Sequence, residues 1–350
     1  MLLDLTKNNT DALEKDLQYQ AAVLPDVSRT FALTIPTLPS RLALVVTNAY
    51  LLCRIADTIE DDPRLDFGQK EANLERFLAT VKEQEDASAF SASVTQLLSP
   101  AIPPAEMELM RNVDRVVGVT HSFTEAERRI LERCVSVMCF DMPKFQRNSS
   151  LAGLRDLPEL DAYCYAVAGV AGEMLVDLFC IQCPELEESR PELRSLAVSF
   201  GQGLQMTNIL KDVWADHERG ACWLPRSVFG DGGLSLENLK ENHRSGEFQN
   251  GLQTLIGIAH GHLGNAMEFT CRIPAREAGI RRFCLWALGL AVLTLRKIQR
   301  NPHFTSSDQV KISRRSVRAT VFATKIMLRS NRGLRWLFRQ AARGLPIRPV

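Results

Sequence analysis

Residues 42–62 have the sequence LALVVTNAYLLCRIADTIEDD, and they are the strongest indication of the fold. Wound as a helix, it is apolar on nearly every face, which predicts a helix at the centre of a packed bundle. Pro63 predicts the end of this helix, because proline has no amide hydrogen to donate and clashes with the preceding turn. The sequence therefore predicts a buried helix that carries a cluster of carboxylates close to its end.

Helical periodicity continues outward from this stretch, and no convincing alternation of period two appears. Two more helices are predicted at 160–179 and 197–216, the first of them rich in alanine and glycine. Such small residues either permit close packing of helices or leave room for a ligand. A polar stretch at 85–104, with prolines near its end, predicts a loop. We expect an all-α chain whose residues 1–350 form a single domain, a helical bundle.

The composition suits a large globular core, with 45% hydrophobic and 24% charged residues in 350. Nine cysteines are too few for a disulfide scaffold, and the pair Cys180 and Cys183 lacks the second pair that a zinc site needs. These features predict a reducing, cytoplasmic setting. The N-terminus has no apolar signal-peptide core. The apolar run at 283–295 is shorter than the roughly 20 residues that span a bilayer, so no transmembrane anchor is expected.

Charge is unevenly distributed along the chain. The net charge is +1, yet no acidic residue follows Asp308, while eleven basic residues do. This asymmetry predicts an anionic partner for the tail, either a membrane surface or a diphosphate, and we expect no nucleic acid partner. From about residue 320 the tail also contains Leu334, Trp336, Leu337 and Phe338. A cationic, partly apolar helix of this kind lies on a membrane surface, here the inner face; a disordered tail is the alternative.

The first acidic cluster lies at the end of the predicted central helix. Asp57, Glu60 and Asp61 are three or four residues apart, so they share one helix face, and the same stripe extends back to Arg54 and Tyr50. Polar groups on such an apolar helix line a cavity or are paired with one another. That Arg54 merely pairs with Asp57 or Asp61 is the simpler interpretation.

A second polar stripe follows in the helix predicted at 197–216. Asn208, Asp212 and Asp216 recur at four-residue steps, Gln205 extends the stripe backward, and Lys211 stands beside it. Clustered carboxylates repel one another unless a cation lies between them, and oxygen ligands with open positions favour Mg²⁺. A solvated acidic face is the alternative. Basic residues beside such a cluster suit a diphosphate, whose charge needs neutralising.

Four segments together resemble the squalene and phytoene synthase family, over about residues 27–318. They are SRTFALTIPTLP at 28–39, AYLLCRIADTIEDD at 49–62, YCYAVAGVAGEML at 163–175 and GQGLQMTNILKDVWAD at 201–216. Members of the family are head-to-head prenyl-diphosphate synthases with an all-helical isoprenoid-synthase fold around a central cavity. Tyr-Cys-Tyr-Ala at 163–166 departs from the Tyr-Cys-His-Tyr of eukaryotic squalene synthases and is closer to bacterial members.

The resemblance implies a set of site residues. The metal-binding positions are Asp57, Glu60, Asp61, Asn208, Asp212 and Asp216. The positions that grip diphosphate are Ser28, Arg29, Arg54, Gln205, Asn208 and Lys211. The catalytic positions are Tyr163, Asp57, Asp61, Asp212 and Asp216, together with the cavity aromatics Tyr50 and Phe283.

The activity that the resemblance implies is the condensation of two farnesyl diphosphates to presqualene diphosphate, followed by reduction to squalene. Mg²⁺ and NADPH are the implied cofactors, with NADPH expected near 217–225 and 311–315. Formation of phytoene or dehydrosqualene, or release of presqualene diphosphate without NADPH, is the alternative within the family. A helical lipid-binding protein without catalysis is the alternative from another class. We expect a monomer.

Overall fold

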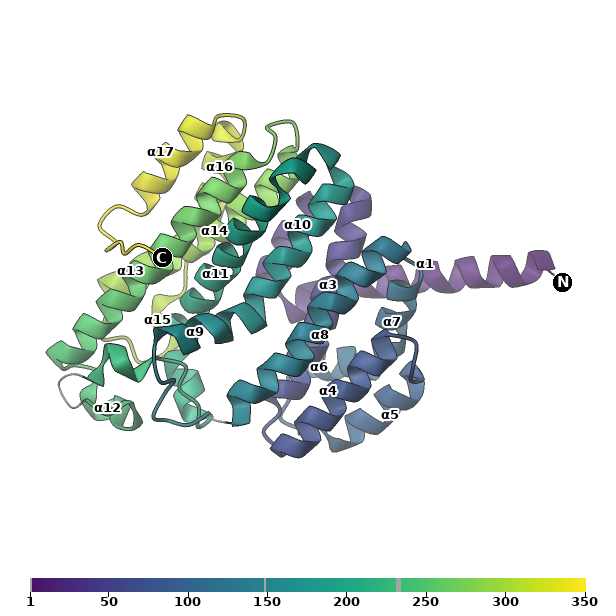
Figure 1. Cartoon of the computed structure of the whole chain (residues 1–350), viewed down its shortest axis with the longest axis horizontal. Helices are drawn as coiled ribbons and strands as arrows, with labels where there is room; N and C mark the ends of the chain where they lie inside the picture. The colour runs from purple at the N-terminus through teal and green to yellow at the C-terminus, as the bar shows by residue number, and fades with distance from the viewer. Residues whose placement is uncertain (1, 148, 231–233) are drawn as a thin grey trace. The chain divides into compact units, whose positions relative to one another are not determined.

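The computed structural model describes residues 2–147, 149–230 and 234–350, with side chains described from residue 11 onward. Within these residues the chain is helical, and its one β contact is the isolated bridge between Leu154 and Pro225. The all-α prediction is therefore confirmed. The helices of at least eight residues are α1 (Leu2–Val27), α3 (Ser40–Asp61), α4 (Phe67–Val81), α5 (Ala87–Leu97), α6 (Pro104–Arg111), α7 (Val113–His121), α8 (Glu125–Arg147), α9 (Leu157–Cys164), α10 (Val170–Gln182), α11 (Arg190–Glu218), α13 (Gly246–Arg272), α14 (Ala278–Arg300), α16 (Arg314–Met327) and α17 (Asn331–Ala341) (Figure 1). The short helices are α2 (Arg29–Thr34), α12 (Leu239–Asn242) and α15 (Ser307–Val310), with single turns η1 (Ile35–Thr37), η2 (Tyr165–Gly169), η3 (Pro184–Ser189), η4 (Arg226–Val228) and η6 (Leu236–Asn238).

The chain divides into two compact units. The first comprises Met1–Arg147 and Asp177–Gln182, and the second comprises Asn148–Val176 and Cys183–Val350. Helix α10 thus begins in the second unit, while its last residues belong to the first. That both units form one domain around a central cavity stays a prediction.

Helix α3 is the core of the first unit. It packs against α1, α4, α6, α7 and α8. Val46, Ala49, Leu51 and Leu52 are all buried, and their spacing spreads them over more than half of the helix circumference. The prediction of a buried central helix at 42–62 is confirmed.

Asp62 ends α3 and fixes the turn that follows. Its Oδ1 accepts hydrogen bonds from the backbone amides of Arg64 at 2.8 Å and Leu65 at 3.1 Å. Its Oδ2 accepts one from the backbone amide of Ser99 at 2.8 Å. The side chain is buried, and these amides satisfy both of its oxygens. The last carboxylate of the acidic run therefore holds the chain together, and the candidate site has to be built from the carboxylates before it.

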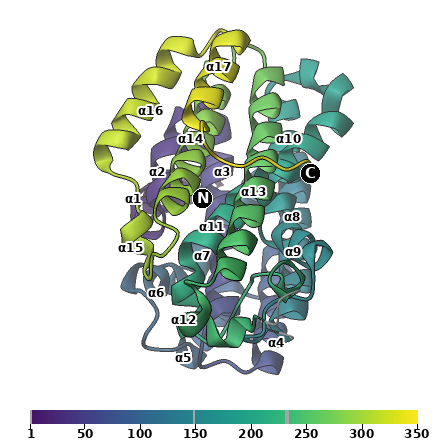
Figure 2. The ribbon, with the colours of Figure 1, turned by 90° about the vertical axis from the view of Figure 1, so that its left-hand side faces the viewer.

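Helix α11 is the core of the second unit and packs against α13, α14 and the π-helical turn η2 (Figures 1 and 2). Two glycines let the neighbouring backbones approach closely. A Cβ on Gly172 would lie 2.2 Å from the carbonyl oxygen of Ala197, and one on Gly201 would lie 2.3 Å from that of Ala168. At these positions the small residues predicted at 160–179 serve close packing of helices, not space for a ligand.

The prediction of a loop at 85–104 is wrong over much of its length, because α5 occupies Ala87–Leu97. Asp86 caps this helix by accepting the amide of Ala89 at 2.7 Å. Phe90 and Val94, four residues apart, are fully buried beneath a face of serine and alanine. A few large apolar residues among small and polar ones gave too weak a periodic signal. Pro104 starts the next helix, where its missing amide hydrogen costs no hydrogen bond.

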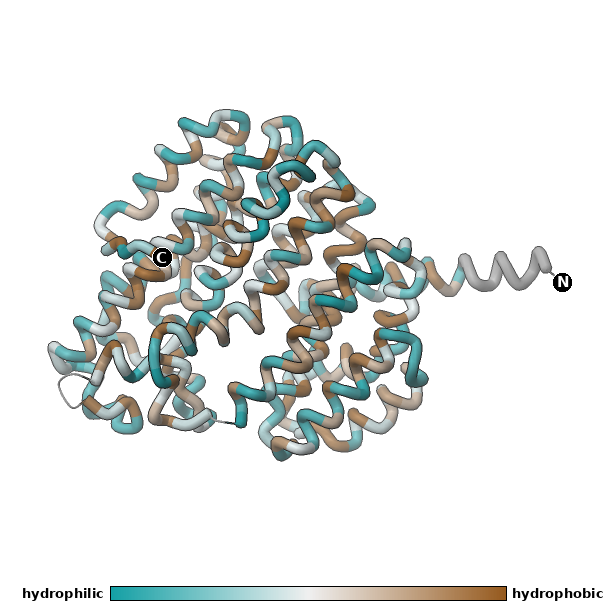
Figure 3. Tube along the Cα trace, viewed as in Figure 1, coloured by the Kyte–Doolittle hydropathy of each residue, from teal (hydrophilic) through white to brown (hydrophobic). Residues whose placement is uncertain are grey.

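Three helices among the described residues are long and apolar enough to cross a membrane, judged by length and composition. They are Ser40–Asp61, Leu157–Gln182 and Ala278–Arg300. In the structure 61%, 61% and 56% of their most apolar windows are buried inside the protein, and Figure 3 shows brown, hydrophobic residues running through the packed helices. Their apolar character is thus largely accounted for by packing within the protein.

Candidate functional site

The first acidic cluster lies on α3, in the first unit. Steps of four, three and four residues place Tyr50, Arg54, Asp57 and Asp61 along one stripe. The Tyr50 hydroxyl donates to the carbonyl oxygen of Val27 at 3.2 Å, and Nη2 of Arg54 donates to the same oxygen at 3.3 Å. The last carbonyl of α1 therefore orients both side chains beside the carboxylates.

Glu106, on α6, joins this cluster although no sequence pattern marked it. Its Oε1 lies 4.0 Å from Nη2 of Arg54, and its Oε2 accepts a hydrogen bond from the Thr58 hydroxyl at 3.4 Å. In the sequence, Glu106 is simply an acidic residue in the first turn of a helix, where it favours the helix dipole. Only the packing of α6 against α3 reveals it as part of the cluster.

The cluster carries more negative charge than Arg54 neutralises. Burial raises the pKa of Asp57 to about 7; Arg54 opposes this rise, while Asp61 and Glu106 add to it. Burial, and then the neighbouring Asp61, also raise the pKa of Glu60 well above its ordinary value. Nε2 of Gln146, from α8, donates to the buried Glu60 carboxylate. A divalent cation beside these oxygens would relieve their repulsion.

Ser28 and Arg29 lie at the start of the short helix α2. The Ser28 hydroxyl accepts the amide of Phe31 at 3.1 Å and so caps this helix. The Phe31 ring lies 4.9 Å from the ring of Tyr50, centroid to centroid, which brings α2 against the stripe on α3. Arg29 is exposed. The structure thus gathers Ser28, Tyr50 and Arg54 in one neighbourhood, with Arg29 in the turn beside them.

The second acidic cluster lies on α11, in the second unit. Asn208 is exposed, Asp212 is half-buried and Asp216 is buried. Nζ of Lys211 lies 3.0 Å from Oδ2 of Asp212, and Nη2 of Arg219 donates to Oδ1 of Asp216 at 2.6 Å. The opposite side of the helix is apolar and buried, as the sequence predicts, through Met206, Leu210 and Val213. Each carboxylate of this cluster therefore already has a basic neighbour.

Tyr163 is held by an aromatic partner that the sequence did not assign to it. It is buried on α9, and its ring stacks on Trp223 at 4.2 Å with an interplanar angle of 8°. Two backbone hydrogen bonds fix the segment of Trp223: the Leu154 amide donates to the Leu224 carbonyl at 3.0 Å, and the Arg226 amide donates to the Leu154 carbonyl at 2.8 Å. These bonds position the indole against the tyrosine.

The remaining predicted residues lie elsewhere in the second unit. Gln205 is half-buried on α11, about one turn before Asn208. Phe283 is buried on α14. Trp286, one turn further along α14, donates its indole N–H to the Thr324 hydroxyl at 3.1 Å, so it ties α14 to α16.

The donor groups of both clusters suit Mg²⁺, but neither cluster is a complete metal site. Throughout the part of the chain that the structure describes, no three or more His, Cys, Asp or Glu side chains come close enough to hold a metal ion. Mg²⁺ usually takes one or two carboxylates and completes its shell with water and substrate phosphates. The oxygen-only donors and the raised pKa of Asp57 fit such a partial site.

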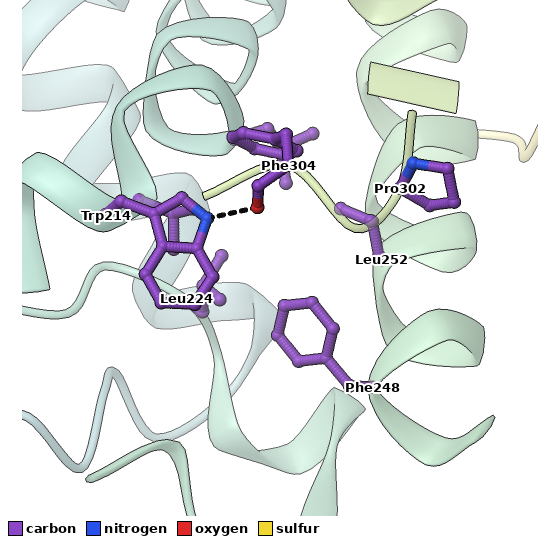
Figure 4. A pocket seen from close by; sticks show the side chains of 8 residues that line it. Trp214, Leu224, Phe248, Leu252, Pro302 and Phe304 are labelled. Carbon is purple, nitrogen blue, oxygen red and sulfur yellow. Dashed lines mark hydrogen bonds between the residues drawn. The ribbon is translucent and has the colours of Figure 1, made fainter. Parts of the chain in front are cut away.

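A small apolar pocket lies behind the second cluster. It is lined by Leu210, Val213, Trp214, Leu224, Phe248, Leu252, Pro302 and Phe304 (Figure 4). The indole N–H of Trp214 points to the carbonyl oxygen of Phe304 at 2.6 Å and is therefore already used. The lining side chains otherwise offer only carbon. This pocket belongs to the apolar back of α11, away from the chemistry of Asp212.

Comparison with known proteins gives a consistent family. The family model described as squalene/phytoene synthase matches residues 24–316. The squalene synthase ERG9 of Gibberella zeae is 27% identical over 304 residues, which cover 85% of this chain and 62% of that protein. Squalene synthase 1 of Arabidopsis thaliana is 25% identical over 280 residues, covering 78% of this chain and 63% of that protein. The chain thus spans about three-fifths of the length of these relatives.

Solved structures show the same fold. A structure of TcSQS with the ligand BPH1237 has a TM-score of 0.75 at 20% identity and covers 95% of this chain and 98% of its own. A dehydrosqualene synthase in complex with a ligand has a TM-score of 0.64 at 20% identity, covering 92% of this chain and 99% of its own. These likenesses confirm the predicted all-helical isoprenoid-synthase fold.

Proposed function

Because this chain belongs to the squalene/phytoene synthase family, we propose that it is a prenyltransferase that joins two farnesyl diphosphates head to head, forming presqualene diphosphate and then squalene. The observation that carries this proposal is the pair of carboxylate stripes on apolar helices, each with a basic residue beside it: Arg54 near Asp57 and Lys211 next to Asp212. The names of the relatives from Gibberella zeae and Arabidopsis thaliana support squalene as the product.

The polar stripes bind the diphosphate groups. On α3, Asp57 and Asp61 would hold Mg²⁺ with Glu60 in support, and on α11 Asp212 would do so with Asn208 and Asp216. When bound, Mg²⁺ neutralises the diphosphate and makes it a better leaving group. Arg54 and Lys211 share the charge of the departing diphosphate, with Ser28, Arg29 and Gln205 as further donors.

The apolar surroundings of these stripes suit the carbocation that the departure of diphosphate creates. One farnesyl diphosphate loses its diphosphate, the double bond of the other attacks the cationic carbon, and loss of one proton closes the cyclopropane ring. Water must be excluded while the cation exists. Tyr163, held in place by Trp223, assists the removal of that proton. Tyr50 and Phe283 stabilise positive charge through their π faces.

NADPH would have to bind this chain without the usual dinucleotide-binding fold. A strand followed by a helix, the usual dinucleotide cradle, does not occur in the described part of the chain. Of the basic residues expected to bind it, Lys311 already pairs with Asp308 at 3.3 Å. The reduction to squalene is therefore proposed from the names of the relatives alone. The second candidate function is release of presqualene diphosphate, dehydrosqualene or phytoene without NADPH. We further propose that the protein is a cytoplasmic monomer.

Product analysis tests the proposal directly. The purified protein is incubated with farnesyl diphosphate and Mg²⁺, with and without NADPH, and the products are identified by mass spectrometry. Squalene that appears only with NADPH is the expected result. Presqualene diphosphate or dehydrosqualene in both reactions would support the second candidate. If neither farnesyl nor geranylgeranyl diphosphate is consumed, the chain is not a synthase of this type.

Carboxylate variants test the role of the stripes. Asp57→Asn and Asp212→Asn should each lower the rate of farnesyl diphosphate consumption by about 100-fold or more, because each removes a charge that would hold the metal ion. Glu218→Gln is the matched control, since Glu218 is an exposed carboxylate on the same helix as Asp212. Unchanged rates in both aspartate variants would show that the acidic stripes are merely surface features.

A further inference from the structure

Helices α16 and α17 expose an unusual combination of side chains, which we call the C-terminal cationic face. It consists of Arg315, Arg318, Phe322, Lys325, Ile326, Arg329, Arg332, Trp336, Arg339 and Arg343. On α16 these residues recur at steps of three and four, so they form one continuous stripe on the outside of the helix. Figures 1 and 2 show α16 and α17 next to each other at the edge of the second unit.

Three large apolar side chains of this face are exposed to solvent. Phe322 is 68% exposed, Ile326 63% and Trp336 50%. An exposed phenylalanine and isoleucine one turn apart gain nothing from the fold that displays them. Exposed apolar groups that cluster in this way mark an interaction site more often than scattered ones do.

The structure changes which tail residues are available to a partner. The sequence alone predicts that a membrane-bound tail helix would contact the membrane through Leu334, Leu337 and Phe338. Leu334 is fully buried instead, and the Phe338 ring packs 5.7 Å from the ring of His260 on α13. The apolar side of α17 is therefore used inside the protein, and α16, with Trp336, carries the apolar surface that remains.

The face is positively charged, and its charge is not neutralised by the protein. No acidic residue follows Asp308 in the sequence. Among the described residues, the ion pairs formed by this terminal segment are those of Lys311 with Asp308 and of Arg335 with Glu268. The basic side chains that flank Phe322, Ile326 and Trp336 are therefore free to bind anions.

The face is also held rigidly. Trp286 of α14 donates to Thr324 of α16 at 3.1 Å, on the inner side of that helix. The buried guanidinium of Arg281 donates to the carbonyl oxygen of Leu328 at 2.9 Å, just after α16 ends. Since α16 is fixed from within, its outer side chains are displayed as one preformed surface.

We propose that the C-terminal cationic face docks onto an anionic lipid bilayer. Phe322, Ile326 and Trp336 insert at the boundary between headgroups and acyl chains, while the arginine and lysine side chains around them bind lipid phosphates. A nucleic acid would use the same charges, but an exposed isoleucine gives it no hydrogen bond and no stacking surface, whereas a bilayer takes it up readily. None of these residues belongs to either acidic cluster, and only Arg315 lies in a segment where NADPH is expected, so docking by Phe322, Ile326 and Trp336 is independent of the reaction proposed above.

Vesicle sedimentation of the full chain tests this proposal without reference to catalysis. We expect binding to vesicles that contain phosphatidylglycerol, little binding to pure phosphatidylcholine, and release when salt rises from about 0.05 to 0.5 M. The double variant Phe322→Ser with Ile326→Ser should bind at least about tenfold more weakly. The matched control is Phe140→Ser with Ile181→Ser, which removes a phenylalanine 52% exposed and an isoleucine 47% exposed elsewhere on the protein.

Trp336 provides a second measurement. Brominated lipids should quench part of the tryptophan fluorescence in the wild type, and Trp336→Phe should abolish that quenching. The docking proposal is overturned if anionic vesicles are not bound, if both double variants bind as the wild type does, or if duplex DNA is bound in preference to vesicles. Because none of these readouts needs a substrate, an inactive protein would leave this test intact.

Discussion

Replacing Gly172 with alanine would test the close approach of α10 to α11. The new Cβ would lie 2.2 Å from the carbonyl oxygen of Ala197 and 2.6 Å from its carbonyl carbon. Both are backbone atoms in a helix, so neither can rotate aside as a flexible side chain would. A carbon and an oxygen need a separation of more than about 3 Å, and the two helices would have to move apart by roughly 1 Å.

The magnitude follows from two opposing effects. Alanine favours a helix over glycine by about 1 kcal/mol, while forcing an extra carbon into a packed interior costs about 1–3 kcal/mol or more. Because the clash here is with backbone, we expect the second effect to win by about 2 kcal/mol. Gly264→Ala is the matched control: Gly264 is also inside a helix, but its added Cβ would meet nothing within 4 Å. That variant should gain about 0.5–1 kcal/mol.

Thermal unfolding followed by circular dichroism compares the two variants in the full chain. For a unit of this size, 1 kcal/mol corresponds to about 2–4 °C in the unfolding midpoint. Gly172→Ala should therefore lower the midpoint by about 5 °C, and Gly264→Ala should raise it by about 2 °C. If Gly172→Ala leaves the midpoint unchanged, or if both variants shift it in the same direction, the backbones of α10 and α11 are not in the contact that the structure shows.

Three further predictions concern ionisable side chains. Burial lowers the pKa of His262 to about 4, so between pH 6.5 and 4 the unfolded chain binds a proton that the folded chain does not, and stability falls as pH falls. The loss of stability approaches about 3 kcal/mol near pH 4. The urea midpoints measured at pH 7 and pH 5 should therefore differ less in His262→Gln than in the wild type. An equal difference in the two proteins would contradict this prediction. Glu106→Gln removes the carboxylate 4.0 Å from Arg54. The variant should bind Mg²⁺-diphosphate about fivefold more tightly, as measured by calorimetry. Weaker binding would mean that the charge of Glu106 assists binding. Arg281→Met leaves the carbonyl oxygens of Ile273 and Leu328 without their donor. It should destabilise the protein by about 3 kcal/mol in urea unfolding. A loss under about 1 kcal/mol would show that water replaces the guanidinium.

Features that depend on spacing along one helix could be predicted from the sequence. The 3.6-residue period places Asp57 and Asp61 on one face and Asp212 and Asp216 on another, whatever the rest of the chain does. The continuous apolar character of 42–62 likewise determined that α3 lies in a core, because no face of it could be left in water. The order of these motifs was sufficient to indicate the family.

Which helices bring partners to those faces depends on tertiary packing and could not be predicted from the sequence. Glu106 and Gln146 reach the first cluster from α6 and α8, and Trp223 reaches Tyr163 from a loop, at sequence distances that no periodic pattern encodes. Asp62 follows the cluster directly in the sequence, and only the tertiary structure shows that its oxygens hold the turn.

The tail shows the same division between sequence and tertiary structure. Its charge and its amphipathic pattern were evident in the sequence, yet the pattern does not say whether the apolar side faces the protein or a partner. Packing buries Leu334 and leaves Phe322 exposed. The physical reason is that helical periodicity is a local property of the backbone, whereas burial depends on how the apolar surface of every other helix is covered when the whole chain packs.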